Sequence, residues 1–591
     1  MIEGSIILMN RLGWYLFSVV TTVLILLIFM VATVLSQDNT QPLPAAISGV
    51  VIDSGGPAAG AIVQIQGTPN TTETAADGTF TLTDIEGTGP LVITAWSYGH
   101  YIGWTTFDPE TAATPDDLRI ELALLPQVDN HKYDWFSFEG VDGSAACGLC
   151  HREFEEWQAD QHSQSAVNHR FLSIYSGTDI NGEMGQPIRW GSDGQALPPD
   201  PDQPYTGPGF VPDNPGGRVG NCTTCHMPMV SKLPTNQNCS WSGCHTSLTI
   251  ERATDYLSFP GTPMSARGDA LEGISCEFCH SIGEVFIDPE TNLPRPDMPG
   301  ILSMRLHRPM EGETPAFFGT LVDVNRKDSY LPLLSESEFC ASCHFGVFGG
   351  VMGVGTMTGG LPVYNSYGEW LESPYSDPDT GQTCQQCHMP EAEQNWFVFE
   401  ERGGLERDYA TLHNHTMLGA ASEDLLQNTI AMTNRVERTT GQLEVEVSLT
   451  NVGAGHHVPT DQPMRSMILV VEALDANDQP LALIGGPLNP DFSGDYAGQP
   501  GKTFALVLRD EWTGDVPTVA FWREISLVED TRIPALATDT TQYVFNVPED
   551  EPITVNIRLL YRRAFYDLMQ QKGWDDPDIL MESETLHVPA N

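Results

Sequence analysis

Alternating apolar and polar residues occur in two separate blocks of the chain, one near each end. In the first block, apolar residues recur at every second position over short runs, separated by the turn-forming pairs Gly55-Gly56 and Asp77-Gly78. This period places successive side chains on opposite faces of a strand. We therefore expect a small β-sandwich over residues 45–125. Its predicted strands cover residues 47–52, 61–66, 79–83, 91–95 and 118–124.

The second block, residues 429–591, shows the same alternation, most clearly over residues 441–450. The sequence Asp530-Thr-Arg-Ile-Pro534 indicates a turn between later strands. Residues 561–569 have a helical pattern of apolar positions. We expect an immunoglobulin-like β-sandwich with a terminal helix. Its other predicted strands cover residues 467–474, 543–547 and 553–560.

The central region, residues 126–428, has little regular periodicity. Glycine and proline are frequent in the chain, with 55 and 43 residues, and the run Glu153–Ala159 is one of few helical patterns here. We expect a loop-rich, mainly α core that is organised around something other than its own helices and strands. The fold class is thus multidomain, with this core flanked by two β-sandwiches.

An uncharged, apolar run extends from Trp14 to Leu35 and follows Arg11. A spanning helix needs about 20 residues, whereas the apolar part of a signal peptide has about 7–15. The run therefore favours a transmembrane helix within residues 1–38, with everything after Ser36 exported to the periplasmic or extracellular side. We expect a single-pass location in the cell membrane. Cleavage after Ser36 is the alternative.

The charge balance is strongly acidic. The formal net charge is −50, from 78 acidic and 28 basic residues. This excludes nucleic acids and anionic membrane surfaces as expected partners and favours basic redox partners, or simply a soluble surface.

The 12 cysteines form six pairs, each closed by a histidine. Five pairs have the pattern C-x-x-C-H, and the third in chain order has a wider gap, Cys239-Ser-Trp-Ser-Gly-Cys244-His245. We number these motifs one to six. The other five comprise Cys147, Cys150 and His151; Cys222, Cys225 and His226; Cys276, Cys279 and His280; Cys340, Cys343 and His344; and Cys384, Cys387 and His388.

This pattern predicts covalent attachment of haem c. Two nearby thiols add to the two vinyl groups of one porphyrin, and the next residue places its imidazole on the iron. Zinc sites and disulfides also use paired cysteines, but neither explains a histidine directly after each pair. We therefore expect six haems, packed closely enough to form a continuous electron path.

The second ligand of each iron decides between electron transfer and chemistry on a small molecule. Ten histidines lie outside the motifs, and we expect His100 and His587 to be structural or on the surface. The other eight suffice for all six irons. These candidates are His131, His162, His169, His307, His413, His415, His456 and His457.

A sequence similarity links two segments of the core. Glu156-Trp157 precedes His162 and Ser163, and Glu369-Trp370 is followed by Tyr375 and Ser376 at the same spacing. The pattern predicts a duplicated haem-wrapping unit whose second copy has Tyr375 in place of the ligand. Tyr375 either packs, which we expect, or serves as a ligand.

Three resemblances support this interpretation. The segments Gly49-Val-Val-Ile-Asp, Gly60-Ala-Ile-Val-Gln-Ile and Ala76-Asp-Gly-Thr-Phe-Thr-Leu resemble the carboxypeptidase regulatory-like domain, which implies a non-catalytic role for residues 45–125. The stretch from Glu156 to Ser163 resembles an element of multihaem cytochromes in which the histidine ligates another haem. The Gly-His-His-Val-Pro-Thr loop and motifs four and six resemble exported multihaem c-type cytochromes.

From these features we expect electron transfer between membrane donors and an external or periplasmic acceptor, with redox proteins as partners. The alternative is an oxidoreductase that acts on a small nitrogen or sulfur compound at one five-coordinate haem. No C-x-x-C-K motif, the type used by multihaem nitrite reductases, occurs in the sequence. Assembly into an oligomer or filament is also open.

Overall fold

The computed structural model of the chain describes residues 41–590, except for residues 112–113, 131–132, 134–135, 214–221, 229–270, 297, 314, 327 and 353–356. The described residues form two compact units. The first extends to Ser97 and includes Gly103–Leu122, while the second comprises Tyr98–Ile102 and the chain from Ala123 onward. All the cysteine motifs that the structure describes therefore belong to the second unit.

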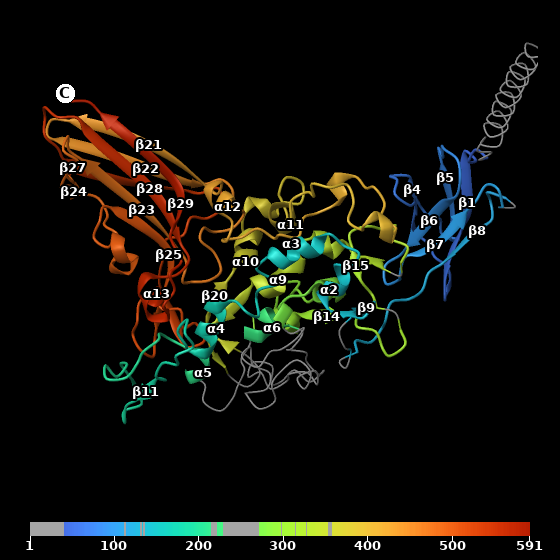
Figure 1. Cartoon of the computed structure of the whole chain (residues 1–591), viewed down its shortest axis with the longest axis horizontal. Coiled ribbons are helices and arrows are strands. Elements are labelled where there is room, and N and C mark those ends of the chain that lie inside the picture. The colour runs from blue at the N-terminus through green and yellow to red at the C-terminus, as the bar shows by residue number, and fades with distance from the viewer. Residues whose placement is uncertain are drawn as a thin grey trace, which may run out of the picture. The chain divides into compact units, whose positions relative to one another are not determined.

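The first unit is a β-sandwich of two four-stranded sheets, drawn in blue in Figure 1. Strand β1 lies between β2 and β5 in one sheet and also pairs with β8 in parallel, while the other sheet has the order β4-β3-β6-β7. Five of the eight strands lie where the alternation predicted them, and β2, β4 and β7 were missed. The strands are β1 (Ala46–Asp53), β2 (Gly56–Pro57), β3 (Ile62–Ile65), β4 (Thr71–Glu73), β5 (Thr79–Thr83), β6 (Leu91–Trp96), β7 (Gly103–Phe107) and β8 (Leu118–Glu121).

The core of this sandwich contains the inward-facing residues of both sheets. Val63, Ile93 and Ile120 are completely buried there. Gly49 is required where β1 meets β8, because a Cβ atom at this position would lie 2.4 Å from the carbonyl oxygen of Leu118. The alternation thus identified the buried face, and the glycine permits the parallel pairing.

The C-terminal part of the second unit is a larger β-sandwich (Figure 1, orange to red). Its sheets have the orders β21-β22-β27-β24 and β26-β25-β23-β28-β29. Leu443, Val445, Leu469, Phe545 and Ile557 are fully buried between them. The strands are β21 (Ile430–Thr439), β22 (Gln442–Asn451), β23 (Ser466–Leu474), β24 (Leu483–Gly485), β25 (Gly501–Asp510), β26 (Ile525–Asp530), β27 (Thr538–Asn546), β28 (Ile553–Arg562) and β29 (Ile579–Val588).

The prediction that this sandwich ends in a helix is wrong. Strand β28 extends to Arg562, α13 spans Tyr566–Lys572, and β29 follows it. Because β29 pairs antiparallel with β28 along its whole length, the helix is the connection between two neighbouring strands. The local pattern indicated a helix, but the pairing of β29 is a long-range contact that the pattern does not show.

The central region is loop-rich, but the prediction of a mainly α core is wrong. The longest helix that the structure describes has eight residues, and strand residues outnumber helical residues over the described chain. Helices this short gain little stability from their own hydrogen bonds and depend on tertiary contacts. They are α2 (Ser144–Cys147), α3 (Glu153–Ala159), α4 (His169–Ser176), α5 (Phe210–Asp213), α6 (Cys222–His226), α8 (Cys276–Ser281), α9 (Glu338–His344), α10 (Ser366–Leu371), α11 (Cys384–His388) and α12 (Glu423–Gln427).

Small two-stranded sheets fill the segments between these helices. They pair β9 with β10, β11 with β12, β13 with β14, β15 with β16, β17 with β20, and β18 with β19. Their strands are β9 (Ser137–Phe138), β10 (Val141–Asp142), β11 (Arg189–Trp190), β12 (Ala196–Leu197), β13 (Ile282–Val285), β14 (Met304–Leu306), β15 (Phe318–Gly319), β16 (Ser329–Tyr330), β17 (Gly346–Phe348), β18 (Val351–Met352), β19 (Met357–Thr358) and β20 (Leu361–Tyr364).

The predicted transmembrane helix, and the single-pass location in the cell membrane that followed from it, must be corrected. Within the part of the chain that the structure describes, no helix has the length and apolar character needed to cross a bilayer. The run from Trp14 to Leu35 that carried this expectation lies outside the described residues.

Candidate haem-binding sites

Five of the six cysteine motifs lie in the described part of the chain, and four of them coincide with a short helix. Helices α6, α8, α9 and α11 each carry both cysteines and the histidine. Residues at positions i, i+3 and i+4 share one face of a helix, so both thiols and the imidazole project together. Motif three, Cys239–His245, lies outside the described residues.

Motif one differs from these four, because its helix does not contain the whole motif. Helix α2 ends at Cys147, so Cys150 and His151 lie beyond it. The backbone N–H groups of Cys150 and His151 both donate to the carbonyl oxygen of Cys147, at 3.0 and 2.9 Å. The carbonyl oxygen of Cys150 accepts from the backbone N–H of Phe399 at 2.9 Å, and its thiol is free and partly exposed. Cys150 therefore lies in a turn that a hydrogen bond from the distant Phe399 supports. Its role in haem attachment stays a prediction from the spacing of the motif.

Local hydrogen bonds fix where the motif helices begin. The Ser275 hydroxyl accepts from the backbone N–H of Phe278 at the start of α8. At α11, Thr383 and Gln386 form a capping box in which each side chain accepts a hydrogen bond from the other residue's backbone N–H. Polar residues before the first cysteine therefore orient the motif.

The described cysteines are all free thiols, so the disulfide alternative is not what the fold forms there. Thiols from different motifs lie against each other: Cys147 with Cys276, Cys225 with Cys343, and Cys340 with Cys384. Hydrogen bonding to Cys384 is the main cause of a raised pKa at Cys340, followed by burial and the charges of Cys384 and Cys279. Motif five is thus close to motifs two, four and six.

Three pairs of imidazole rings face each other across the core, and each pair joins a motif histidine to a histidine from a distant segment. The ring centroids of His162 and His344 lie 6.3 Å apart, those of His280 and His415 also 6.3 Å, and those of His388 and His456 6.2 Å. Two imidazoles that bind one metal at about 2 Å, with ring radii of about 1.1 Å, place their centroids about 6.2 Å apart. All three separations fit a shared metal ion.

The remaining ring nitrogens of these pairs are engaged in hydrogen bonds. Each Nδ1 atom has an oxygen partner, which leaves Nε2 as the lone-pair donor. The partners of the motif histidines are Asp461 Oδ2 for His344 (3.1 Å), Phe318 O for His280 (2.6 Å) and Leu418 O for His388 (2.5 Å). Those of the opposite histidines are Asp160 Oδ1 for His162 (2.7 Å), His413 O for His415 (3.1 Å) and His457 O for His456 (2.9 Å).

Burial favours the neutral form of three of these six imidazoles, as metal ligation requires. Burial lowers the pKa of His280 and of His388, and burial together with the charge of His280 lowers the pKa of His415 to about 3. His344 differs. Burial acts to lower its pKa, but the hydrogen bond and negative charge of Asp461 outweigh burial and raise it.

The donor set fits haem. In the described part of the chain, no three His, Cys, Asp or Glu side chains converge as ligands of a bare metal ion. Two opposed imidazoles instead supply two axial ligands, and the paired thiols beside one of them supply the attachment points of a porphyrin. The imidazole pairs and the cysteine motifs therefore match the same cofactor.

The other predicted ligands have different surroundings. His151 stacks beside Phe397 at 5.8 Å, and His226 lies flat on Phe171 at 3.8 Å; neither faces a second imidazole among the described residues. Burial lowers the pKa of both histidines to about 4. His131 and His245 lie outside the described residues.

The remaining candidates are held by other contacts. His169 meets the edge of Trp574, His307 meets the edge of Phe318, and the Nδ1 atom of His413 lies 3.1 Å from the carbonyl oxygen of Met389. Outside the candidate set, His100 Nδ1 lies 3.1 Å from the carbonyl oxygen of Tyr98, and His587 lies on β29 near Thr554.

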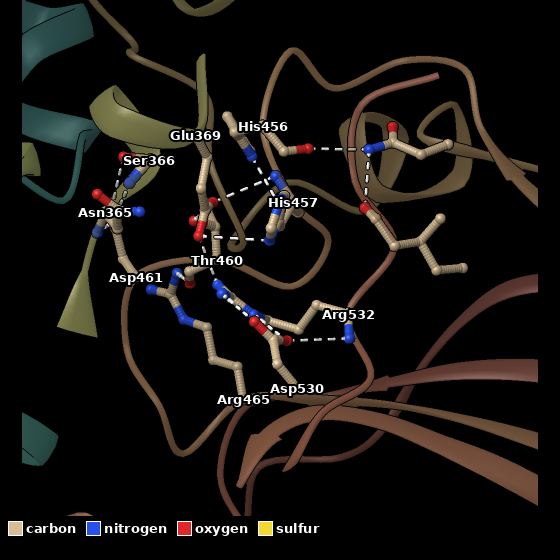
Figure 2. Close-up of polar contacts among 12 residues, drawn as sticks. Asn365, Ser366, Glu369, His456, His457, Thr460, Asp461, Arg465, Asp530 and Arg532 are labelled. Atoms are coloured by element: carbon tan, nitrogen blue, oxygen red, sulfur yellow. Dashed lines mark hydrogen bonds and ion pairs between the residues drawn. The ribbon is translucent and has the colours of Figure 1, made fainter. Parts of the chain in front are cut away.

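The neighbours His456 and His457 have separate tasks. His456 faces His388, whereas His457 Nδ1 lies 3.7 Å from Glu369, which also accepts hydrogen bonds from Thr460 and Arg532 at 2.6 Å each. Figure 2 shows this network, which joins α10 to the loop of the C-terminal sandwich that carries His456. The Glu369 side chain is only 2% exposed. Sequence reasoning missed Glu369 and Arg532, because neither belongs to a ligand motif.

The predicted duplication has a structural counterpart. The first copy comprises motif one, α3, His162 and motif four; the second comprises motif five, α10, Tyr375 and motif six. The indole N–H of Trp157 donates to Ile274 O at 2.9 Å, and that of Trp370 donates to Gln382 O at 2.8 Å. Both acceptors lie two residues before the first cysteine of the later motif.

Further hydrogen bonds repeat between the copies. Ser163 Oγ and Ser376 Oγ each donate to the carbonyl oxygens five and three residues earlier. The carbonyl oxygens of His162 and Tyr375 accept from the backbone N–H before the later motif at 3.1 and 3.0 Å. Tyr375 therefore occupies the position of His162.

Tyr375 packs rather than facing a motif histidine. A Cβ atom on Gly455 would lie 3.1 Å from its ring, and its hydroxyl donates to Val452 O at 3.4 Å. Both contacts are with the loop that precedes His456. In the second copy, the residue at this position therefore supports the loop that carries His456.

Comparison with known proteins adds little to this geometry. No protein-family model and no curated protein matches the sequence. Among solved structures, the penta-haem cytochrome c552 from Thermochromatium tepidum is similar at a TM-score of 0.47 and 16% identity, over 76% of this chain and 98% of that chain. A chain of a type II cohesin–X-dockerin complex from Acetivibrio cellulolyticus has a TM-score of 0.12 and 16% identity, over 14% of this chain and 60% of that chain. At such TM-scores neither likeness carries an argument.

Proposed function

We propose that the chain binds six haem c groups, one at each cysteine motif, and transfers electrons among them. The observation that carries this proposal is the set of three imidazole pairs at the separation expected for a shared metal, each with one member at the end of a cysteine motif. Haem iron, when bound, takes up and releases one electron.

The chain's own residues would hold the cofactor in defined roles. The two thiols of each motif attach it, the motif histidine supplies one axial ligand, and His162, His415 and His456 supply the second at motifs five, four and six. The candidates for the second ligand at motifs one, two and three are His131, His169, His307, His413 and His457. Two imidazoles at one iron leave no position for substrate, which favours electron transfer over catalysis.

The contacts between motifs support a continuous path. Motif one lies against motif four through Cys147 and Cys276, and motif five is close to motifs two, four and six. Electrons entering at any of these five sites would have a neighbour to which they can pass. The net charge of −50 favours a basic redox protein as donor or acceptor.

The test is a haem count combined with spectroscopy of the purified holoprotein. Intact mass should show six attached haems, and changing Cys239 and Cys244 to alanine should remove one. The matched change of Cys147 and Cys150 to alanine should remove one as well, at the motif that lies outside a continuous helix. The sites at motifs four, five and six should be low-spin and unchanged by cyanide or carbon monoxide. Electron transfer with a basic partner should slow as ionic strength rises.

The oxidoreductase alternative predicts a different spectrum. A high-spin fraction that binds nitrite or hydroxylamine would identify a five-coordinate haem and support catalysis there. A holoprotein whose haems do not titrate reversibly with a chemical reductant would overturn electron transfer altogether.

A further inference from the structure

We propose that Asp160 and Asp461 hold the haem site at motif five at a lower reduction potential than the sites at motifs four and six. The proposal rests on the function proposed above, because it concerns the axial ligands His344 and His162. It assigns a tuning role to two carboxylates that lie outside every cysteine motif.

Asp461 belongs to the loop of the C-terminal sandwich that also carries His456. Its Oδ2 atom lies 3.1 Å from His344 Nδ1 and accepts from the Ser366 hydroxyl at 3.1 Å. Its Oδ1 atom accepts from the backbone N–H groups of Asn365 and Ser366 at 3.0 and 2.9 Å. Figure 2 shows the contacts of Asp461 with Asn365 and Ser366 at the start of α10. With donors on both oxygens and 12% exposure, the carboxylate is fixed in place.

Asp160 acts on the opposite ligand of the same site. It terminates α3, and its Oδ1 atom accepts from the backbone N–H of His162 at 2.8 Å and lies 2.7 Å from His162 Nδ1. The side chain is only 3% exposed. Asp160 therefore places a buried carboxylate next to the Nδ1 atom of His162, which lies only two residues later in the chain.

The other two described sites lack this arrangement. Their four Nδ1 atoms are paired with backbone carbonyl oxygens, at Phe318, His413, Leu418 and His457. A carboxylate carries a full negative charge, so it draws the Nδ1 proton more strongly than a neutral carbonyl does. The imidazole becomes a more electron-rich ligand and stabilises the more positive, oxidised iron.

This difference places the most strongly donating ligand pair at motif five, next to motifs two, four and six. Among the sites at motifs four, five and six, motif five should be the last to be reduced. An electron that reaches it would pass readily to a neighbour.

The test compares Asp461→Asn and Asp160→Asn with the unchanged holoprotein by spectroelectrochemical titration. Asparagine retains an oxygen acceptor but removes the charge. Loss of a partner behind a metal-bound histidine typically changes ligand strength about tenfold, which is a positive shift of about 59 mV for a one-electron couple. Asp379→Asn is the control, because it makes the same substitution at an exposed position near motif six.

Electron paramagnetic resonance identifies the site that shifts. The imidazole planes of His162 and His344 are inclined by 59°, against 20° and 8° in the other two pairs. The ferric low-spin signal depends on this angle, so motif five should give the most anisotropic signal of the three. In both variants that signal should appear at a higher potential while the other two do not move beyond the control.

The proposal is overturned if both variants titrate like Asp379→Asn, or if the shifted signal belongs to another site. If Asp461→Asn does not fold because it loses its contacts with α10, Asp160→Asn still tests the proposal. Failure of the proposed function would look different, since the unchanged protein would then lack haem or reversible reduction.

Discussion

The two copies of the haem-wrapping unit share their backbone hydrogen bonds but differ at one position. This position is His162 in the first copy and Tyr375 in the second. In the first copy, His162 faces His344 of motif five, while in the second, Tyr375 packs on the loop before His456. The tryptophan and serine hydrogen bonds around these positions are the same in both. These contacts therefore set the path of the chain around a motif in both copies. The axial ligand is not needed for this path, because the second copy has Tyr375 at the ligand position.

The largest expected effect is on ligation. Replacing His162 with alanine should leave the site at motif five with one axial histidine, because no second imidazole in the described part of the chain faces His344 at that separation. Its anisotropic low-spin signal should disappear and a high-spin signal should replace it. The matched change, Tyr375→Phe, should alter no haem signal. An unchanged resonance spectrum in His162→Ala would break the comparison.

The glycine three residues before the later motif should be intolerant of substitution in both copies. A Cβ atom on Gly381 would lie 2.0 Å from Tyr375 O, and one on Gly273 would lie 2.8 Å from His162 O. Alanine at either position should destabilise the protein by about 3 kcal/mol, since backbone cannot move aside as a side chain can. Denaturant unfolding measures this. Alanine at the exposed Gly194, where no atom lies nearby, should cost less.

The C-terminal sandwich also contacts the core region through a buried charge, Lys572. Its ammonium donates to the carbonyl oxygens of Ser173, Thr178 and Pro208 at 3.0, 3.2 and 2.9 Å. Lys572→Met removes all three hydrogen bonds, so it should lower the free energy of unfolding by about 2 kcal/mol.

Lys572 also predicts a pH dependence. Burial lowers its pKa to about 7 in the folded protein, below about 10.4 for an unfolded lysine. Between these pH values the unfolded chain binds more protons, so the unfolding free energy of the wild type should rise with pH relative to Lys572→Met. Equal slopes for the two proteins from pH 7 to 10 would contradict this.

The smallest effect should come from the paired tryptophans. Phenylalanine at Trp157 or at Trp370 removes one hydrogen bond to the segment before a cysteine motif, at a cost of about 1 kcal/mol each. Similar losses at the two positions would sharpen the comparison between the copies. A loss at only one position would show that the same hydrogen bond contributes unequally to the stability of the two copies.

Local patterns predicted the features that depend on near neighbours. The alternation over residues 441–450 falls in β22 from Gln442 onward, and the i, i+3, i+4 spacing of Cys384, Cys387 and His388 lies within α11. The similarity between Trp157 and Trp370 also indicated the duplicated unit, since it repeats a set of short-range contacts. The mainly α core was wrong because glycine, proline and short motif helices leave most of this region irregular.

Contacts between distant segments were beyond those patterns. Nothing local to His415 or His456 shows that they face His280 and His388, and nothing local to Asp461 shows that it lies behind His344. An imidazole presents the same chemistry whichever partner it faces. Its partner depends on which loops the folded chain brings to the same place.

By itself, the sequence determined the cysteine motifs, hence the cofactor they suit, and about half of the strands of the two sandwiches, because spacing alone decides which side chains share a face. Only the tertiary structure decided which histidine pairs with which motif, that Tyr375 packs, and that two carboxylates lie behind one ligand pair. Those outcomes depend on long-range packing, where residues far apart in the chain meet at hydrogen-bonding distance.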